Sequence, residues 1–282
     1  LGDGAPKTIG QALAGLAGDF DAVVIDNYRL DAAQEAPVAA RGVRIVVVDD
    51  LADRAHRCDL LIDSSFARRG EDYAGLVGEG GVVLAGVAYA PLRPGFAAVR
   101  PRAQARRDGR PVERALVSLG LTDLGGVTAR VVETVLPLLG DIRLDVVVGE
   151  GARSLEQLKA LGHDDPRIRL HVDATDVERL MLEADAAIGA GGSTTWERAC
   201  LGLPSLTVVL ADNQGVQSRA LAERGMILAV DARSTAFVDD LVAGWGRLVG
   251  DAELRRSMSR QTMALCDGRG AQRVAGAILA LG

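Results

Sequence analysis

The sequence predicts an α/β fold with parallel sheets, and three observations support this prediction. Apolar runs that suit strands alternate with amphipathic helical patterns along most of the 282 residues. Valine runs at 46–48 and 146–148 lack polar alternation, which is typical of strands buried on both faces. Hydrophobic residues make up 48% of the chain and aromatic residues only 3%, so aliphatic side chains must build the cores.

The expected elements alternate in order along the chain. A short Ala-rich helical pattern at 8–16 comes first. Strands are then expected at 22–26, 43–48, 60–63, 82–85, 114–118, 143–148, 168–171, 186–189, 205–209 and 226–229. Between the later strands, helices are expected at 126–138, 154–161, 177–182, 194–201 and 214–224. Six strands make a complete Rossmann-like domain, whereas the first four do not, and after Ala236 the pattern is purely helical.

The break between two domains is expected near 91–111. Prolines, arginines and a loss of periodicity mark this segment as a linker, and its arginine-rich part, Arg100–Arg110, is expected to be a solvated connection. The predicted domains are therefore 1–100 and 111–282. Their strand ends would face a shared cleft in which a ligand binds.

Composition excludes several classes of partner and site. A net charge of −6 without a dense basic stripe predicts no nucleic-acid partner. Three dispersed cysteines and three histidines predict no metal site, no cofactor and free thiols in a reducing cytoplasm. No apolar run is long enough to span a membrane and no secretory leader is visible, so a cytoplasmic protein is expected. The oligomeric state is not predicted.

The most informative segment is AAIGAGGSTTWE at 186–197. Glycines and hydroxyl residues follow its strand-like run: Gly189, Gly191, Gly192, Ser193 and Thr194. Such a turn exposes backbone N–H groups at the start of a helix, and glycines let a phosphate approach closely. Glu197, one turn later, would reach the ribose of a bound nucleotide. The alternative is an ordinary connection with Ser193 as helix N-cap, and this segment alone does not separate the two.

Other polar turns follow predicted strands, where ligands of α/β proteins bind. They contain Asn27 and Tyr28; Asp49 and Asp50; Gly120, Thr122 and Asp123; His171 and Val172; and Asn213 and Gln214. Capping and ordinary loop roles remain alternatives for each of them. Asp49 and Asp50 should point apart, so we expect no two-carboxylate mechanism, and His56 is expected to have a packing or surface role.

The order and spacing of these motifs resemble the PseG-type UDP-sugar hydrolases. The matching segments are 23–31, 46–59, LAGVAYAPLRPGF at 84–96, SLGLTD at 118–123, AGGSTTWE at 190–197 and DNQ at 212–214. The resemblance covers nearly the whole chain, and the Gly-rich turn with Glu197 is shared with the wider GT-B superfamily, including MurG-like transferases. It implies a GT-B fold of two Rossmann-like domains with a UDP-sugar between them.

The resemblance also implies a reaction and a site. The reaction is inverting, metal-independent hydrolysis of UDP-2,4-diacetamido-2,4,6-trideoxy-β-L-altropyranose in pseudaminic acid biosynthesis, which serves flagellin glycosylation. Tyr28 and Asn213 are the catalytic candidates, as groups that orient the sugar or the water. The implied nucleotide-binding residues are Gly120, Thr122, Asp123, His171, Val172, Gly191, Gly192, Ser193, Thr194, Glu197 and Gln214. Among them, Glu197 would accept from the ribose, and His171 and Val172 would hold uracil through backbone groups.

The sequence departs from the family at three points. The family opens with a strand and a Gly-His loop whose His is the expected base, and nothing before Thr8 resembles it. We therefore expect the first βα units to be missing and the chain to be inactive by itself. Leu121 stands within the family's Gly-Gly-Thr, and Asp63 replaces an Asn.

Two alternatives to the hydrolase remain open. One is a MurG-like UDP-sugar glycosyltransferase, although the sequence contains no apolar or basic patch suited to a lipid acceptor. The other is a nucleotide-sugar-binding fragment without catalysis.

Overall fold

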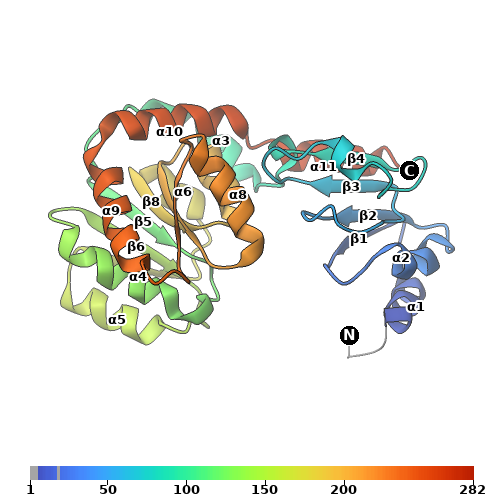
Figure 1. The fold of residues 1–282 in the computed structure, drawn as a ribbon, viewed down its shortest axis with the longest axis horizontal. Helices are drawn as coiled ribbons and strands as arrows, with labels where there is room; N and C mark the ends of the chain where they lie inside the picture. The colour runs from blue at the N-terminus through green and yellow to red at the C-terminus, as the bar shows by residue number, and fades with distance from the viewer. Residues whose placement is uncertain (1–5, 18–19) are drawn as a thin grey trace. The chain divides into compact units, whose positions relative to one another are not determined.

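The structure is a computed structural model that describes residues 6–17 and 20–282. The chain divides into two compact units, the first formed by residues 1–92 and 269–282 and the second by residues 93–268 (Figure 1). The segment 1–5, in which the sequence shows no match to the family's Gly-His loop, lies outside the described residues. In the described part of the chain, no helix has both the length and the apolar character needed to cross a membrane.

The first unit contains one parallel sheet in the order β1-β2-β3-β4. Its strands are β1 (Ala22–Asp26), β2 (Arg44–Val48), β3 (Leu60–Asp63) and β4 (Val82–Ala85). Its helices are α1 (Pro6–Ala17), α2 (Ala32–Ala39), α11 (Gly270–Leu279) and the 3₁₀ turns η1 (Gly70–Tyr73) and η2 (Val87–Tyr89). Alternate strand residues point to opposite faces: Ile45 and Val47 form a core with Val38 of α2, while Val46 and Ile62 pack against α11.

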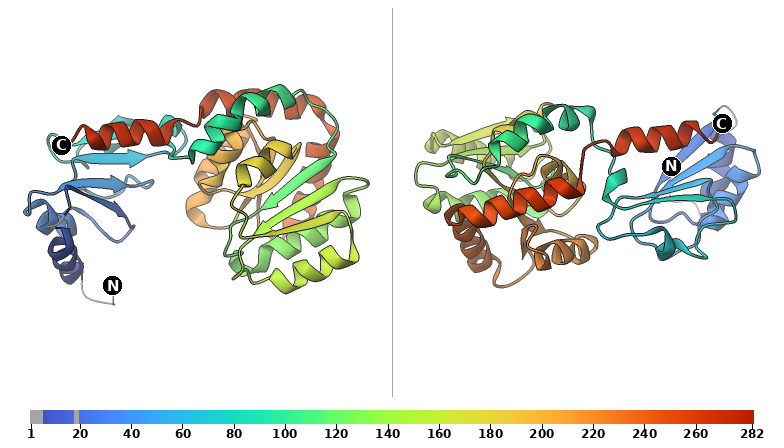
Figure 2. Two further views of the ribbon diagram at one scale, coloured as in Figure 1. Left: turned by 180° about the vertical axis from the view of Figure 1, so that it is seen from behind. Right: turned by 90° about the horizontal axis from the view of Figure 1, so that it is seen from above.

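The second unit contains six parallel strands in the order β10-β9-β8-β5-β6-β7. The strands are β5 (Arg114–Ser118), β6 (Arg143–Val148), β7 (Ile168–Val172), β8 (Ala186–Ala190), β9 (Ser205–Val209) and β10 (Leu228–Asp231). The α-helices are α3 (Pro94–Arg106), α4 (Val127–Val135), α5 (Leu155–Asp164), α6 (Val177–Glu183), α7 (Thr194–Cys200), α8 (Asp212–Glu223), α9 (Phe237–Gly250) and α10 (Ala252–Leu265), with 3₁₀ turns η3 (Leu124–Gly126) and η4 (Leu136–Leu138). Helices lie on both sides of this sheet (Figure 2), as in doubly wound Rossmann-like domains. The predicted fold class is confirmed.

The division of the chain differs from the predicted domains 1–100 and 111–282. The boundary falls between Leu92 and Arg93, and residues 269–282 belong to the first unit. The predicted linker 91–111 is largely helix α3, because Pro94 lies in its first turn, where no N–H donor is required. The C-terminal helix α11 belongs to the first unit because Val274 and Ile278 cover the apolar face around β3.

The arginine-rich run Arg100–Arg110 is not the solvated connection that the sequence predicts. Arg100 donates to the carbonyl oxygens of Cys200 and Met263. Arg107 donates to the carbonyls of Met181, Ala184 and Leu201, and its burial lowers the pKa of the guanidinium to about 10. The last carbonyls of a helix have no partner within that helix, so these arginines cap α6, α7 and α10 from α3.

Candidate functional site

Two glycine-rich turns leave the second sheet side by side. Strands β5 and β8 are neighbours, with Ser118 opposite Gly189, and the chain winds outward in opposite directions from this pair. The turn 119–126 follows β5, and the turn 191–193 follows β8. In open α/β sheets this switch point forms a crevice in which ligands bind. The structure therefore brings together two motifs that the sequence could only note separately.

The three glycines of the β8 turn have different roles. A side chain at Gly189 would overlap the Arg198 guanidinium, and a Cβ at Gly191 would lie 2.7 Å from Ser218 Oγ and 3.1 Å from Gln214 Cβ. A Cβ at Gly192 would meet nothing closer than 3.9 Å. Gly189 and Gly191 therefore make room for protein side chains, and the nucleotide contact expected at Gly191 stays a prediction. Only Gly192 borders open space.

The structure also argues against an N-cap role for Ser193. This residue is exposed and its side chain makes no capping hydrogen bond to α7. Its neighbour Thr194 is half-buried, and Thr194 Oγ1 accepts a hydrogen bond from Arg198 Nη1 at 3.1 Å. The Ser193 hydroxyl therefore has no capping duty in the helix, whereas the Gly192 carbonyl accepts a hydrogen bond from the Thr195 N–H at 3.0 Å.

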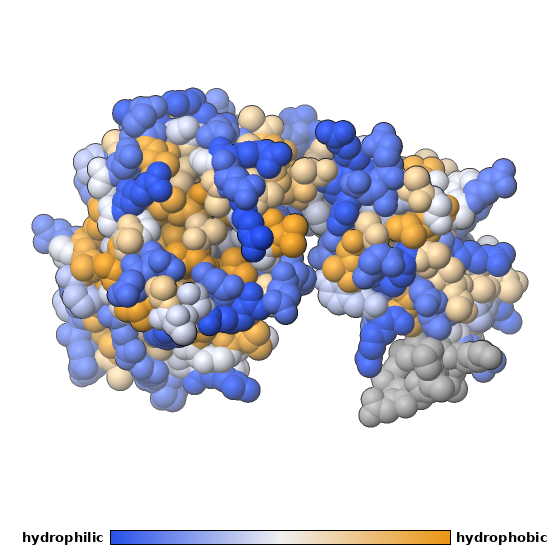
Figure 3. Space-filling view, viewed as in Figure 1, coloured by the Kyte–Doolittle hydropathy of each residue, from blue (hydrophilic) through white to orange (hydrophobic). Residues whose placement is uncertain are grey.

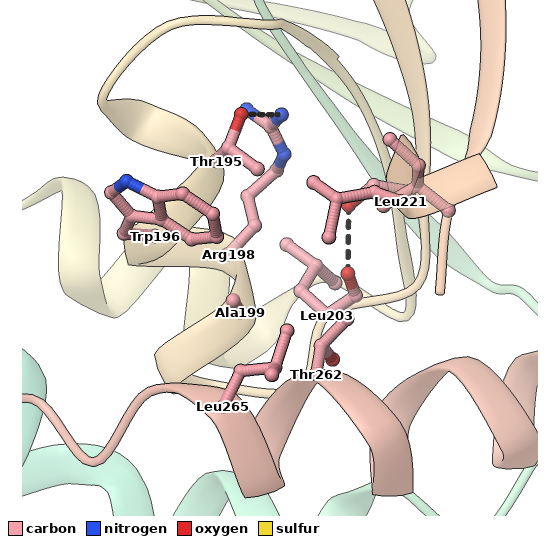
Figure 4. Close-up of a pocket in the computed structure, with 10 residues that line it drawn as sticks. Thr195, Trp196, Arg198, Ala199, Leu203, Leu221, Thr262 and Leu265 are labelled. Carbon is pink, nitrogen blue, oxygen red and sulfur yellow. Dashed lines mark hydrogen bonds between the residues drawn. The ribbon is translucent and has the colours of Figure 1, made fainter. Parts of the chain in front are cut away.

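Arg198 is a buried cation beneath this turn that sequence reasoning missed. Its side chain is 2% exposed, and Nη2 donates to the Ala190 carbonyl at 2.8 Å and to Thr195 Oγ1 at 3.3 Å (Figure 4). Burial lowers its pKa to about 10, although the charge of Glu197 opposes this shift. The absence of a side chain at Gly189 was the one signal in the sequence that could have revealed it. Below the guanidinium, α7, α8 and α10 enclose a cavity of about 10 Å³, which is too small for a nucleotide.

Glu197 is a half-buried carboxylate with no hydrogen bond or ion pair to the described residues. Burial raises its pKa, and this effect outweighs the opposing charges of Arg93 and Arg198. A carboxylate in such a position has unused acceptor capacity, whereas buried polar groups normally have partners. The geometry fits an acceptor for hydroxyl groups of a ligand in the crevice.

Asp123 supports the β5 turn from within. It is buried with a positive φ of 46°, and its carboxylate accepts from the Thr128 N–H at 2.9 Å and from both the N–H and the hydroxyl of Ser154. Burial alone would raise its pKa, but these hydrogen bonds outweigh it and leave the pKa lowered. The structure therefore gives Asp123 a role in holding the loop, with its oxygens already occupied by protein donors.

The other candidates of the second unit lie around the same sheet edge. Gly120 has a positive φ of 104°, and Thr122 is exposed. Gln214 Oε1 accepts from the Leu210 N–H at 3.0 Å, so this side chain fixes the start of α8, while Asn213 is exposed. Leu121 is 53% exposed, and its carbonyl accepts from the Gly149 N–H.

His171 and Val172 end strand β7, the last strand of the sheet. The His171 imidazole Nε2 lies 2.6 Å from Asp145 Oδ1, and Asp145 also pairs with Arg114. One ring nitrogen is thereby held by Asp145, and the edge strand also offers backbone groups to a ligand. This arrangement is compatible with the expected backbone contacts.

In the first unit, Tyr28 and Asp50 form a pair at the strand ends. Tyr28 is 55% exposed, and its hydroxyl donates to Asp50 Oδ2 at 3.1 Å. Partial burial raises the pKa of Asp50, while the Tyr28 hydrogen bond opposes this shift. Asp49 points the other way into the core, where Tyr73 lies 2.8 Å from both Asp49 and Asp63. The expectation that Asp49 and Asp50 point apart is confirmed.

His56 is a buried packing residue. Its Nδ1 lies 2.7 Å from Glu35 Oε1, and both side chains are at most 1% exposed. Glu35 Oε2 also accepts from the Arg57 N–H at 2.6 Å. The packing role expected for His56 is confirmed, and its imidazole has no access to a ligand.

The chain is similar in sequence to two named proteins, whereas no family model matches it. It is 27% identical over 194 residues to the spore coat polysaccharide biosynthesis protein SpsG of Bacillus subtilis, covering 68% of this chain and 56% of SpsG. It is 24% identical over 207 residues to the UDP-2,4-diacetamido-2,4,6-trideoxy-β-L-altropyranose hydrolase of Campylobacter jejuni, covering 73% of this chain and 72% of that protein. The match to SpsG thus spans little more than half the length of that protein.

Solved structures share the fold at low sequence identity. MurG of Acinetobacter baumannii superposes with a TM-score of 0.65 at 17% identity, covering 98% of this chain and 77% of MurG. The complex of MnaA from S. aureus with UDP superposes with a TM-score of 0.66 at 13% identity, covering 98% of this chain and 81% of MnaA. The resemblance predicted from the sequence is therefore confirmed: the chain is similar to a UDP-2,4-diacetamido-2,4,6-trideoxy-β-L-altropyranose hydrolase and to SpsG, and it has the GT-B fold of two Rossmann-like domains.

Proposed function

We propose that the second unit binds the UDP part of a UDP-sugar in the crevice between β5 and β8. The observation that supports this most directly is the pairing of two glycine-rich turns at the switch point, with the unpartnered carboxylate of Glu197 beside them. Backbone N–H groups at Gly192 and Ser193 would hold the β-phosphate, and Gly120 and Thr122 would face it from β5. Glu197 would accept from the ribose, and the backbone of His171 and Val172 would contact uracil.

We propose that the reaction of the whole protein is hydrolysis of the sugar–phosphate bond in a UDP-linked 2,4-diacetamido-2,4,6-trideoxyhexose. UDP is a good leaving group, so one base that activates water on the opposite face of the sugar suffices, with inversion and without a metal. The turn after β8 would stabilise the charge that develops on the leaving diphosphate. Tyr28, with its hydroxyl held by Asp50, and Asn213 would orient the sugar or the water. The C. jejuni relative supports the hydrolase over a glycosyltransferase, which remains the second enzyme candidate.

Calorimetric titration with UDP and UMP tests the nucleotide site. We expect the chain to bind UDP at least about 10-fold more tightly than UMP, since the β-phosphate adds charge-assisted hydrogen bonds at the turn. Equal affinities would contradict the placement of the β-phosphate at residues 191–194.

Replacing Glu197 by alanine should weaken UDP binding by about 1–3 kcal/mol, the scale of hydrogen bonds to a charged group. Titration with 2′,3′-dideoxy-UDP provides the control, because a ligand without ribose hydroxyls should bind the wild type and the variant alike. Glu156→Ala, which removes an exposed carboxylate from α5, should leave both affinities unchanged. A folded Glu197→Ala variant with wild-type UDP affinity would show that Glu197 does not contact the ribose.

We further propose that this 282-residue chain by itself releases little UDP from the nucleotide sugar, so that it acts as a binding module. A positioned base typically contributes about 10²–10⁴-fold. Of the three histidines, His56 is buried against Glu35 and His163 is on the exposed side of α5, while His171 lies at the uracil end of the proposed site rather than beside the sugar. A coupled assay of UDP release checks this: turnover comparable to that of the C. jejuni hydrolase would place the base within these residues.

A further inference from the structure

A positive charge lies directly under the turn that follows β8. Arg198 extends from α7 back toward the start of the helix, as long helical side chains do, and passes along Gly189, where no side chain blocks it. Its Nη2 atom holds the Ala190 carbonyl at the end of β8, and its Nη1 atom holds the Thr194 hydroxyl on the far side of the turn. The guanidinium therefore joins the two ends of the segment that includes Gly191, Gly192 and Ser193.

No carboxylate of the described residues forms an ion pair with this charge, although the neighbouring Glu197 raises its pKa from a longer distance. None of the ion pairs between described residues includes Arg198, and its buried Nε has no hydrogen-bond partner among them. A buried, unpaired cation is costly unless it serves an anion. The helix α7 has only seven residues, so its own dipole is a weak source of positive potential at the turn. Arg198 is the stronger source.

The hydrogen bonds of Arg198 also fix the direction of a hydroxyl proton. A guanidinium is only a donor, so Thr194 Oγ1 acts as the acceptor in their contact. The proton of the Thr194 hydroxyl is then left for a different acceptor. Thr194 is half-buried next to exposed Ser193, in the turn that follows β8. The arrangement prepares Thr194 to donate to an anion on the turn.

We propose that Arg198 is a positioning residue that makes the β8 turn selective for nucleoside diphosphates over monophosphates. It supplies charge from beneath the turn and orients the Thr194 hydroxyl and the backbone N–H groups toward a terminal phosphate, without touching the ligand itself. This inference rests on the proposed binding of UDP in the crevice and assigns its diphosphate specificity to one buried side chain.

The test measures the ratio of UMP to UDP dissociation constants in four variants of the 282-residue chain. Arg198→Met, which keeps an unbranched apolar stem and removes the guanidinium with its charge and donors, should raise the UDP constant about 10- to 100-fold and the UMP constant less than about 3-fold. Arg198→Lys keeps the charge but not the planar, forked set of guanidinium donors. Its UDP dissociation constant should lie between those of the wild type and Arg198→Met. Thr194→Val should raise the UDP constant about 10-fold and leave the UMP constant near wild type.

Arg255→Met is the matched control, because Arg255 is also buried and bonds only to backbone carbonyls, those of Leu248, Val249, Gly109 and Arg110. It should lower the melting temperature and leave the UMP-to-UDP ratio unchanged. A folded Arg198→Met variant with the wild-type ratio would overturn the inference. If that variant does not fold, a wild-type ratio in Thr194→Val overturns it instead. A wild-type chain that binds no UDP refutes the proposed function itself, an outcome visible before any variant is compared.

Discussion

Replacing Asp123 by alanine is expected to abolish measurable UDP binding and to lower the free energy of unfolding of the second unit by about 3–5 kcal/mol. The change leaves three protein donors without their acceptor, the N–H groups of Thr128 and Ser154 and the Ser154 hydroxyl, at about 1–3 kcal/mol each when buried. It also places alanine at a φ of 46°, which aspartate tolerates better. Calorimetric titration with UDP and thermal unfolding monitored by circular dichroism measure the two effects.

The matched control is Asp123→Asn, which keeps the shape, one acceptor oxygen and the tolerance of a positive φ. It should retain part of the stability and part of the UDP affinity. The pKa of Asp123 is lowered in the folded protein, so its carboxylate stabilises the fold above the ordinary pKa of Asp and ceases to do so as the pH falls through the folded value. The difference in stability between wild type and Asp123→Asn should therefore shrink below about pH 4. Wild-type affinity in Asp123→Ala would mean that the β5 turn does not contribute to the nucleotide site.

Replacing His56 by alanine should destabilise the first unit by about 3–5 kcal/mol, because it leaves the Glu35 carboxylate buried without its main partner. Hydrogen exchange followed by mass spectrometry should show loss of protection in strands β1 to β3, while the second unit keeps its protection. UDP affinity should change little, since the residues of the proposed nucleotide site lie in the second unit.

Two further variants separate the buried pair from a general effect of histidine removal. His163→Ala, at the exposed end of α5, should leave protection unchanged. The double change Glu35→Leu and His56→Leu should recover much of the lost stability, because apolar groups of similar volume remove the unpaired charge. A His56→Ala variant as stable as the wild type would show that the His56–Glu35 pair does not stabilise the first unit.

The contacts of Arg198 and Asp123 suggest a common design for the two turns of the crevice. One buried charged side chain fixes each turn. Arg198 of α7 lies beneath the β8 turn, and Asp123 lies within the β5 turn itself. The exposed groups, such as Ser193 and Thr122, are then free of structural duties. The surface of each unit interleaves hydrophilic and hydrophobic residues on the face shown in Figure 3.

The sequence by itself determined the strands, most of the helices and the location of the glycine-rich turns. Strand β5 occurs at Arg114–Ser118 as predicted, and β10 lies two residues beyond its predicted bounds, at Leu228–Asp231. These features follow from local periodicity and from residues that permit tight turns, and both signals are contained in a few consecutive residues. The resemblance to UDP-sugar hydrolases also came from the order of local motifs.

Only the tertiary structure decided which groups these motifs contact. The Arg198 guanidinium of α7 occupies the space beside Gly189, and Ser218 of α8 lies beside Gly191. Asp123 accepts a hydrogen bond from the N–H of Ser154 at the start of α5. The arginines at α3 cap helices that lie far along the chain. Helix α11 belongs to the first unit, so the observed domain boundaries differ from the predicted ones. Burial decides these contacts, because a charge or a helix end that is removed from water needs a hydrogen-bond partner. That partner can come from a residue at any distance along the sequence.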